Sequence, residues 1–245
     1  MFDHVTIRVA DRDASRRFYE LVLATLGFGS LQTSGGHYDE WNDFGISQAR
    51  DDRPVTRRLH VAFVARSRDA VDDVWRTATG VGYPSDGAPG LRPVYHDDYY
   101  GAFLLDPDGN SVEPVYHGRA REGDCVIDHL WIRVADLAAS KRFYETIAPV
   151  LGLRIAGERP ERFHVAGGDR SFALVAGDAP TEHLHIAFPV PDNETVADFH
   201  RVAVAAGYRD NGGPGERPEW HPGYYGAFVL DPDGNNVEAV NHSRG

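Results

Sequence analysis

The stretch YYGAFLLDPDGNSVE at residues 99–113 returns at residues 224–238 as YYGAFVLDPDGNNVE, identical at 13 of 15 positions. Other segments recur at the same offset of 125 residues, for example DHVTIRVAD at 3–11 and DHLWIRVAD at 128–136. The constant offset means that no net insertion separates these segments. A repeat of this length is too long for a solenoid unit, so the sequence predicts a duplicated domain.

The predicted domains are residues 1–117 and residues 125–245. The segment GRAREGD at 118–124 is polar, contains glycine, and is interpreted as the linker. Each repeat also has an internally double pattern, in which an alternating strand precedes an amphipathic helix and several short strands. This pattern starts at DHVTIRV and starts again about 56 residues later at LHVAFVA. Four strand–helix–strand–strand–strand modules are therefore expected, which is an α+β fold.

Composition narrows the class of protein. The 245 residues carry a formal net charge of −12, which disfavours nucleic acid and anionic membranes as partners. No apolar run approaches the roughly 18 residues of a membrane span, and the charged N-terminus does not resemble a signal peptide. A single cysteine, Cys125, excludes an internal disulfide framework. These features predict a cytoplasmic protein that binds neither nucleic acid nor membrane.

Three polar side chains recur on expected strands, at intervals of 56 and 53 residues in both repeats. Each points away from the apolar residues of its strand, toward a face that would line a cavity if the sheet curls. Two imidazoles and a carboxylate suit Fe²⁺ or Mn²⁺, with Ni²⁺ and Zn²⁺ as alternatives. A lone strand histidine is more often a satisfied core or surface residue, but repetition favours metal binding. The predicted trios are His4, His60 and Glu113, and His129, His185 and Glu238.

A second recurring set precedes the glutamate strand. It comprises His96, Tyr99 and Tyr100, matched by His221, Tyr224 and Tyr225. These side chains could transfer protons and position substrate near the metal, or they could pack a loop. The catalytic candidates are His96, His221, Tyr100 and Tyr225.

Other recurring polar residues have less defined roles. His117 and His242 lie four residues beyond the glutamates and are expected at an exposed rim, outside the metal site. Arg8 and Arg133 follow the first histidine of each repeat and would bind a substrate anion or pair with a carboxylate.

The segments DHVTIRVAD, FYELVLATLGF, LHVAFVA and YYGAFLLDPDGNSVE resemble the vicinal oxygen chelate superfamily, the glyoxalase, bleomycin-resistance and dioxygenase group. The resemblance covers nearly the whole chain, twice. It implies tandem domains whose four βαβββ modules form curled half-barrel sheets around a divalent metal. The metal ligands would fall on the six histidines and glutamates given above. Substrate oxygens would chelate the metal, which acts as a Lewis acid.

The subclass stays open. The closing segments resemble the extradiol dioxygenase signature, but Phe103 and Phe228 occupy the position of its tyrosine. A glyoxalase I site would need a second glutamate at the end of the first module, where FGISQA offers only Gln48. The two-His-one-Glu set also resembles fosfomycin-type thiol transferases. We predict a lyase, isomerase, dioxygenase or transferase acting on a small oxygenated molecule.

The alternative is a metal-free protein that sequesters a planar drug between aromatic side chains. Trp131 replaces Thr6 beside the first histidine, so unequal sites are expected, with the second repeat slightly favoured as the working one. The chain would be a monomer or a homodimer, because duplication can supply the pairing that single-copy relatives obtain by dimerising.

Overall fold

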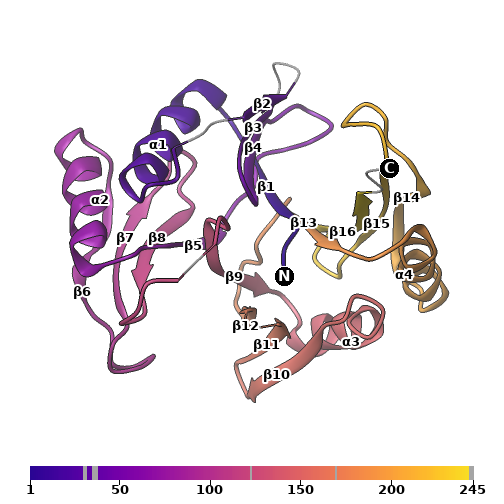
Figure 1. Ribbon diagram of the computed structural model, residues 1–245. Coiled ribbons are helices and arrows are strands. Elements are labelled where there is room, and N and C mark those ends of the chain that lie inside the picture. Colours follow the sequence, from indigo (N-terminus) through magenta and orange to yellow (C-terminus); the bar gives the residue numbers. More distant parts are fainter. Residues whose placement is uncertain (30–31, 35–37, 122, 169, 243–245) are drawn as a thin grey trace. The chain divides into compact units, whose positions relative to one another are not determined.

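The computed structural model describes residues 1–29, 32–34, 38–121, 123–168 and 170–242. The elements follow the order βαβββ four times, which confirms the predicted α+β fold of four modules (Figure 1). The first repeat contains β1 (His4–Val9), α1 (Arg12–Thr25), β2 (Gln32–Ser34), β3 (Tyr38–Trp41), β4 (Phe44–Gln48), β5 (His60–Val64), α2 (Arg68–Gly80), β6 (Ser85–Leu91), β7 (Tyr100–Leu105) and β8 (Ser111–Tyr116). The second contains β9 (Ile127–Val134), α3 (Leu137–Ile147), β10 (Arg154–Arg159), β11 (Arg162–Gly167), β12 (Arg170–Ala176), β13 (His185–Pro189), α4 (Asn193–Ala205), β14 (Arg209–Glu216), β15 (Tyr224–Leu230) and β16 (Asn236–His242).

The strands form two large, curled sheets that do not close. One has the order β14-β15-β16-β13-β1-β4-β3-β2, and the other has the order β10-β11-β12-β9-β5-β8-β7-β6. In each sheet the opening strand of a repeat, β1 or β9, lies next to the strand that opens a module of the other repeat. This order decides which histidines meet.

The compact units do not coincide with the sequence repeats. One unit comprises residues 7–130, and the other comprises residues 131–245 together with residues 1–6. We call them the 7–130 unit and the 131–245 unit. The boundary cuts β1 after Thr6 and β9 after Leu130, so the start of each opening strand belongs with the other repeat. Residue 122 of the predicted linker lies outside the described residues.

Helix α1 shows why the local sequence folds as it does. The Asp11 carboxylate accepts the backbone N–H of Ala14 and caps the helix. Phe18 and Tyr19, fully buried, occupy one face of the helix. The Tyr19 ring lies 4.8 Å from that of Phe44 on β4, between ring centroids. Helices therefore bury one face of the strands and leave the histidine face for other uses.

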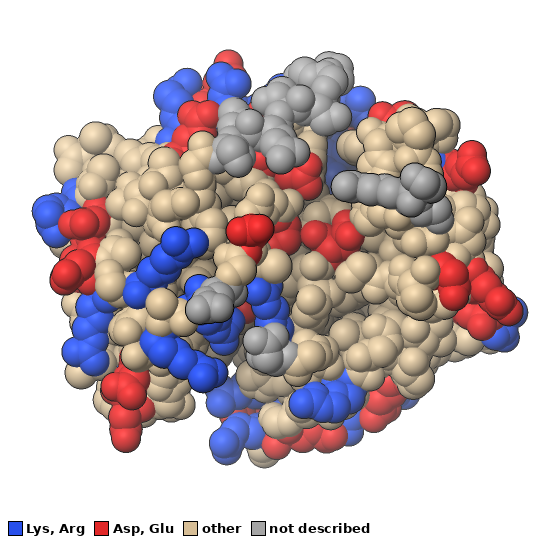
Figure 2. Space-filling model, viewed as in Figure 1, with Lys and Arg blue, Asp and Glu red and all other residues tan. Residues whose placement is uncertain are grey.

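Surface charges are mixed. The face drawn in Figure 2 carries interspersed basic and acidic side chains, without one dominant sign. None of the helices within the described residues is both long and apolar enough to span a membrane.

Candidate metal centre

Parallel strand pairing brings one histidine and one glutamate together in each unit. In the 7–130 unit, β5 and β8 pair so that Ala62 is level with Glu113, two residues beyond His60. His60 Nε2 lies 3.1 Å from Glu113 Oε2. In the 131–245 unit, β13 and β16 repeat this register, and His185 Nε2 lies 3.0 Å from Glu238 Oε2.

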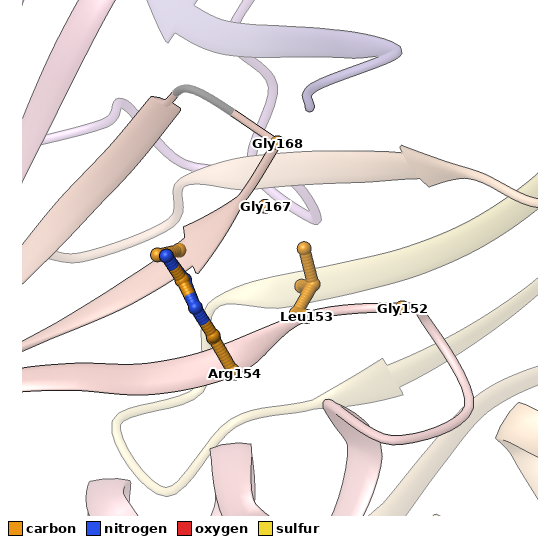
Figure 3. Close-up of a pocket in the computed structure, with 6 residues that line it drawn as sticks. Gly152, Leu153, Arg154, Gly167 and Gly168 are labelled. Atoms are coloured by element: carbon orange, nitrogen blue, oxygen red, sulfur yellow. The ribbon is translucent and has the colours of Figure 1, made fainter.

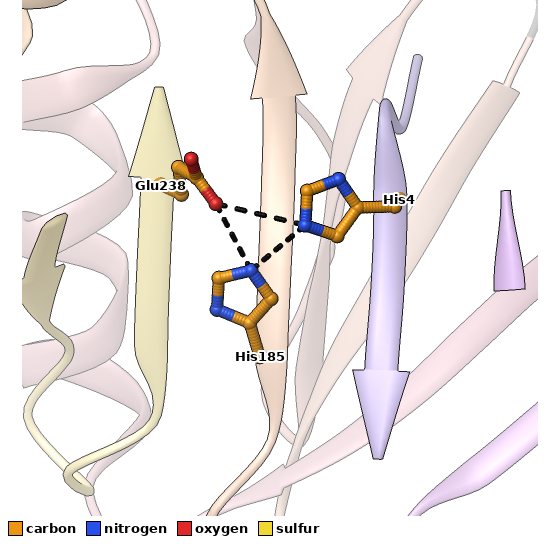
Figure 4. Close-up of side chains that lie close together, drawn as sticks. All are labelled: His4, His185 and Glu238. Atoms are coloured by element: carbon orange, nitrogen blue, oxygen red, sulfur yellow. Dashed lines mark hydrogen bonds and ion pairs between the residues drawn. The ribbon is translucent and has the colours of Figure 1, made fainter. Parts of the chain in front are cut away.

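The third donor comes from the opening strand of the other repeat. β1 runs antiparallel to β13, with Thr6 level with His185. His4 Nε2 lies 3.0 Å from His185 Nε2 and 3.6 Å from Glu238 Oε2, and the three side chains converge from three strands (Figure 4). We call this trio the His4 centre.

The same arrangement recurs in the 7–130 unit. His129 Nε2 lies 3.7 Å from Glu113 Oε2, and the donor atoms of His60, Glu113 and His129 all fall within 4.8 Å of one another. We call this trio the His129 centre.

The grouping of ligands by repeat is therefore wrong. His4 does not join His60 and Glu113, and His129 does not join His185 and Glu238; the two first histidines are exchanged. The reason is the sheet order, which places β1 beside β13 and β9 beside β5. The six predicted residues do form two groups of two histidines and one glutamate, but each group draws on both repeats.

The donor spacing fits a divalent ion. Ligand atoms about 2.1 Å from one ion lie about 3.0 Å apart when their bonds meet at a right angle, and about 3.6 Å apart near 120°. The three separations in the His4 centre are 3.0, 3.0 and 3.6 Å. The glutamates are buried, with side chains 1% exposed, and the histidines are partly open, at 14–16%. A buried carboxylate beside two imidazoles is a suitable environment for a cation.

Asp3 fixes the tautomer of His4. Its Oδ1 lies 2.8 Å from His4 Nδ1, and its Oδ2 lies 2.9 Å from His242 Nε2. Burial opposes ionisation of the Asp3 carboxyl, but the bonds to His242 and His4 outweigh burial and hold its pKa well below its usual range. An ionised carboxylate only accepts hydrogen bonds, so His4 Nδ1 carries the proton. The lone pair of His4 is then on Nε2, the atom that faces the other donors.

Asp128 does the same for His129. Its Oδ1 lies 2.8 Å from His129 Nδ1 and 3.0 Å from His117 Nε2. Burial is again outweighed by these bonds, which lower the pKa of Asp128. Arg121 Nη1 lies 2.9 Å from Oδ2, close enough for an ion pair, although no N–H is aligned with that buried oxygen.

Each ligand glutamate accepts a hydrogen bond from a tyrosine. Tyr224 donates to Glu238 Oε1 at 2.7 Å, and Tyr99 donates to Glu113 Oε1 at 2.8 Å. Burial and then the charge of Glu113 raise the pKa of Tyr99 far above its usual range, so this phenol stays protonated. These tyrosines hold the carboxylates and are unsuited to act as bases.

The tyrosines predicted as catalytic lie elsewhere. Tyr100 donates to Asp72 on α2 at 2.8 Å, a bond that raises its pKa. The Tyr225 hydroxyl makes no hydrogen bond to any described residue. Both adjoin the tyrosines that contact the glutamates, and alternation along β7 and β15 turns them to the opposite face. The structure therefore places Tyr99 and Tyr224 against the glutamates. The predicted Tyr100 and Tyr225 lie on the other face of the strand.

The predicted acid–base histidines reach the metal centres only through other residues. His221 Nε2 lies 2.8 Å from His242 Nδ1, and His96 Nε2 lies 2.8 Å from His117 Nδ1. His117 and His242, expected at an outer rim, are thus part of the surroundings of the centres. The signal that could have revealed them was their recurrence four residues after each glutamate.

A glycine makes room for each ligand carboxylate. A Cβ built on Gly226 would lie 2.6 Å from Glu238 Oε1, and one on Gly101 would clash with Glu113 Oε1. The repeated YYGAF segment therefore requires its glycine for a close approach. Next to it, the rings of Phe103 and Phe228 lie 6.0 and 6.2 Å from those of His60 and His185.

Gln48 does not serve as a fourth donor. Its Oε1 accepts the backbone N–H of Arg12, and its Nε2 donates to the carbonyl of Ala10. It holds the start of α1. Arg8 pairs with no carboxylate among the described residues, and burial followed by the charge of Arg53 lowers its pKa. Arg133 is exposed.

A separate hollow lies on the β10–β11 hairpin of the 131–245 unit. This pocket, of about 460 Å³, is lined by residues that include Leu153 and Arg154 (Figure 3). Neither metal trio contributes to its lining.

Comparison with known proteins agrees with the fold. Glyoxalase I from Zea mays is 19% identical with a TM-score of 0.70, and the match covers 99% of this chain and 92% of that chain. A putative dioxygenase from Bacillus subtilis subsp. subtilis str. 168 is 14% identical with a TM-score of 0.64, covering 100% and 86% of the two chains. At these identities the likeness shows the fold alone, and no match to a curated protein reaches significance.

The sequence itself matches a family in two segments, residues 1–113 and residues 126–239. Each segment lies within one of the two repeats, and together they contain all six residues of the candidate metal centres. The chain therefore belongs to the Glyoxalase/Bleomycin resistance protein/Dioxygenase superfamily.

Proposed function

We propose that the protein is a metal-dependent enzyme that acts on a small molecule with two adjacent oxygen atoms. The observation that carries this proposal is the convergence of two imidazole nitrogens and a carboxylate oxygen, from three strands, in both units. A protein that only trapped an aromatic drug would have no need for this donor set. The bound ion would be Fe²⁺ or Mn²⁺ first, with Ni²⁺ or Zn²⁺ as alternatives.

The residues of the chain have separate tasks in this proposal. His4, His185 and Glu238 would hold one ion, and His129, His60 and Glu113 would hold the other. Three protein donors leave positions for substrate oxygens, and the ion would polarise those oxygens as a Lewis acid. The aspartates keep each first histidine in the tautomer that presents Nε2, and the tyrosines keep each glutamate oriented.

The surroundings narrow the reaction class. Phe103 and Phe228 stand near the histidines without a phenol, and Tyr99 and Tyr224 are engaged with the glutamates, so extradiol ring cleavage lacks its usual acid. The engagement of Gln48 at α1 leaves no fourth donor from β4, which disfavours glyoxalase I chemistry. An isomerase, lyase or transferase that stabilises an enolate or alkoxide fits the remaining groups best.

Elemental analysis of the purified protein tests the proposal. Wild-type protein should contain up to two equivalents of a divalent transition metal, and Glu113→Gln and Glu238→Gln should each lose one. Metal-free protein that binds a planar aromatic drug equally well in all three forms would overturn the proposal in favour of sequestration.

A second assay separates the reaction classes. After anaerobic loading with Fe²⁺, oxygen uptake is measured with catechols. The expected result is no uptake above the level of the Glu113→Gln/Glu238→Gln double variant; uptake well above it would identify a dioxygenase. A cytoplasmic location and a monomeric or homodimeric state stay predictions from the sequence.

A further inference from the structure

We propose that His242 and His221 position the metal-ligating His4 through Asp3, and that His117 and His96 position His129 through Asp128. This inference rests on the proposed metal binding and assigns four histidines outside the donor trios. The contacts in each unit run from a metal-ligating histidine, through an aspartate and a second histidine, to a histidine in the loop before β7 or β15.

The inner contact has a fixed direction. At neutral pH an aspartate carboxylate carries no proton and only accepts hydrogen bonds, so His242 Nε2 donates to Oδ2 while His4 Nδ1 donates to Oδ1. His242 thereby holds the carboxylate that orients His4. Without this donor, one oxygen of a largely buried carboxylate would lose its partner, and the carboxylate could rotate away from His4.

The outer contact holds His242 itself. The only ring nitrogen of His242 not used by Asp3 is Nδ1, and it lies 2.8 Å from His221 Nε2. The two rings are stacked, with centroids 5.0 Å apart, and His221 Nδ1 lies 2.8 Å from the carbonyl oxygen of Pro222. His221 belongs to the loop between β14 and β15, so the loop backbone anchors the chain.

The same histidine pair also contacts the support of the glutamate. The edge of the Tyr224 ring packs against His242 and His221, at centroid distances of 5.1 and 5.4 Å. Tyr224 in turn donates to Glu238. The pair therefore buttresses two of the three donors of the His4 centre.

The His129 centre has the same chain of residues but differs in its contacts. His129 and His117 bond to the same oxygen, Asp128 Oδ1, and His96 Nδ1 accepts the backbone N–H of Asp98. His117 Nε2 donates to Asp128, and His117 Nδ1 lies 2.8 Å from His96 Nε2. Asp128 also has the Arg121 ion pair at 2.9 Å. Loss of His117 still leaves Asp128 beside the guanidinium of Arg121, so the His129 centre should tolerate that loss better than the His4 centre tolerates loss of His242.

The experiment measures Mn²⁺ binding by electron paramagnetic resonance of the free ion, one centre at a time. Glu113→Gln silences the His129 centre, and His242→Phe, His242→Gln and His221→Phe are then made in that parent. We expect His242→Phe to weaken Mn²⁺ binding about 10-fold, at the lower end of the range for groups that orient metal ligands. His242→Gln should recover most of the affinity, because the Gln amide nitrogen sits where Nε2 did and still donates to Asp3. His221→Phe should fall between the two.

Three further measurements complete the test. His200→Phe is the matched control, because His200 Nε2 bonds Asp210 at 2.9 Å in the same unit without a link to the trio, and it should leave Mn²⁺ affinity unchanged. Imidazole ¹⁵N NMR of the metal-free parent should show His4 protonated on Nδ1, and His242→Phe should erode that state. In a Glu238→Gln parent, His117→Phe should weaken Mn²⁺ binding at the His129 centre. This loss should be smaller than the loss that His242→Phe causes at the His4 centre in the Glu113→Gln parent.

The outcomes separate the two proposals. If the Glu113→Gln parent binds no Mn²⁺, the proposed function fails and this inference fails with it. If the parent binds Mn²⁺ while His242→Phe matches His200→Phe in affinity and in the His4 tautomer, only this inference is overturned.

Discussion

The hydrogen bond between Tyr224 and Glu238 gives a prediction that distinguishes the observed site from the one expected from sequence. Tyr224→Phe removes the hydroxyl that lies 2.7 Å from Glu238 Oε1 and changes little else in the ring packing. Tyr224 is 7% exposed and Glu238 is 1% exposed, so water cannot readily replace the lost donor.

The expected loss of stability follows from the strength of this hydrogen bond. A hydrogen bond to a charged group contributes about 1.5–3 kcal/mol to stability. In a chain of this size, 1 kcal/mol shifts the apparent Tm by about 2–4 °C. The apparent Tm of chelator-treated Tyr224→Phe should therefore fall by about 3–12 °C, measured by circular dichroism.

The neighbouring tyrosine provides the control. Tyr225→Phe removes a hydroxyl that bonds to no described residue, and its Tm should change by about as little as for an ordinary surface substitution, within about 0.5 kcal/mol. Tyr99→Phe should reproduce the loss in the other unit, through Glu113. A Tyr224→Phe protein as stable as Tyr225→Phe would refute the assignment of these tyrosines as supports of the glutamates.

Three further predictions test the centres and their surroundings. Gly226→Ala should reduce metal content by about one equivalent in elemental analysis, because its Cβ would lie 2.6 Å from Glu238 Oε1, whereas Gly213→Ala, with no atom within 4 Å of its Cβ, should not. Saturating Mn²⁺ at 100 times its Kd should stabilise the folded protein by about 2.7 kcal/mol per centre in urea unfolding, and chelator should abolish this gain. Burial raises the pKa of Asp231 to about 6, from 3.8, despite hydrogen bonds from Asn235. The unfolded chain therefore ionises first as pH rises, so this residue lowers stability by about 2 kcal/mol between pH 4 and pH 6, and Asp231→Asn should flatten that part of the urea-unfolding profile.

The repeat and the strand alternation sufficed to predict the four modules and to select six side chains that converge in two trios. Alternation in LHVAF separates His60 from Val61 and Phe63, and the structure keeps that separation, with the two apolar residues fully buried. Such alternation is a local property of the sequence, and it correctly predicts which face of the strand is buried.

The exchange of His4 and His129 could not be predicted from local patterns. DHVTIRV and DHLWIRV are nearly the same strand, so either could pair with β5 or β13 by sequence alone. The choice depends on the order of strands in the finished sheets, which is a property of the whole chain. Because the two opening strands are similar, their sequences do not determine which of them pairs with β5 and which with β13.

The supporting residues were missed for a different reason. Asp3 and Asp128 directly precede the first histidines in the sequence. Each carboxylate can be recognised as a support for its histidine only when a second histidine is known to bond to it. That second residue, His242 or His117, is 239 or 11 positions away in the sequence. The two spacings differ so much that no motif with fixed intervals could describe both.

The exchange of opening strands also sets an order during synthesis. Residues 7–130 include His60, Glu113 and His129, so all three residues of the His129 centre are translated before the last residues of the His4 centre. His4 is made first of all six donors, yet it must wait until Glu238 has been translated.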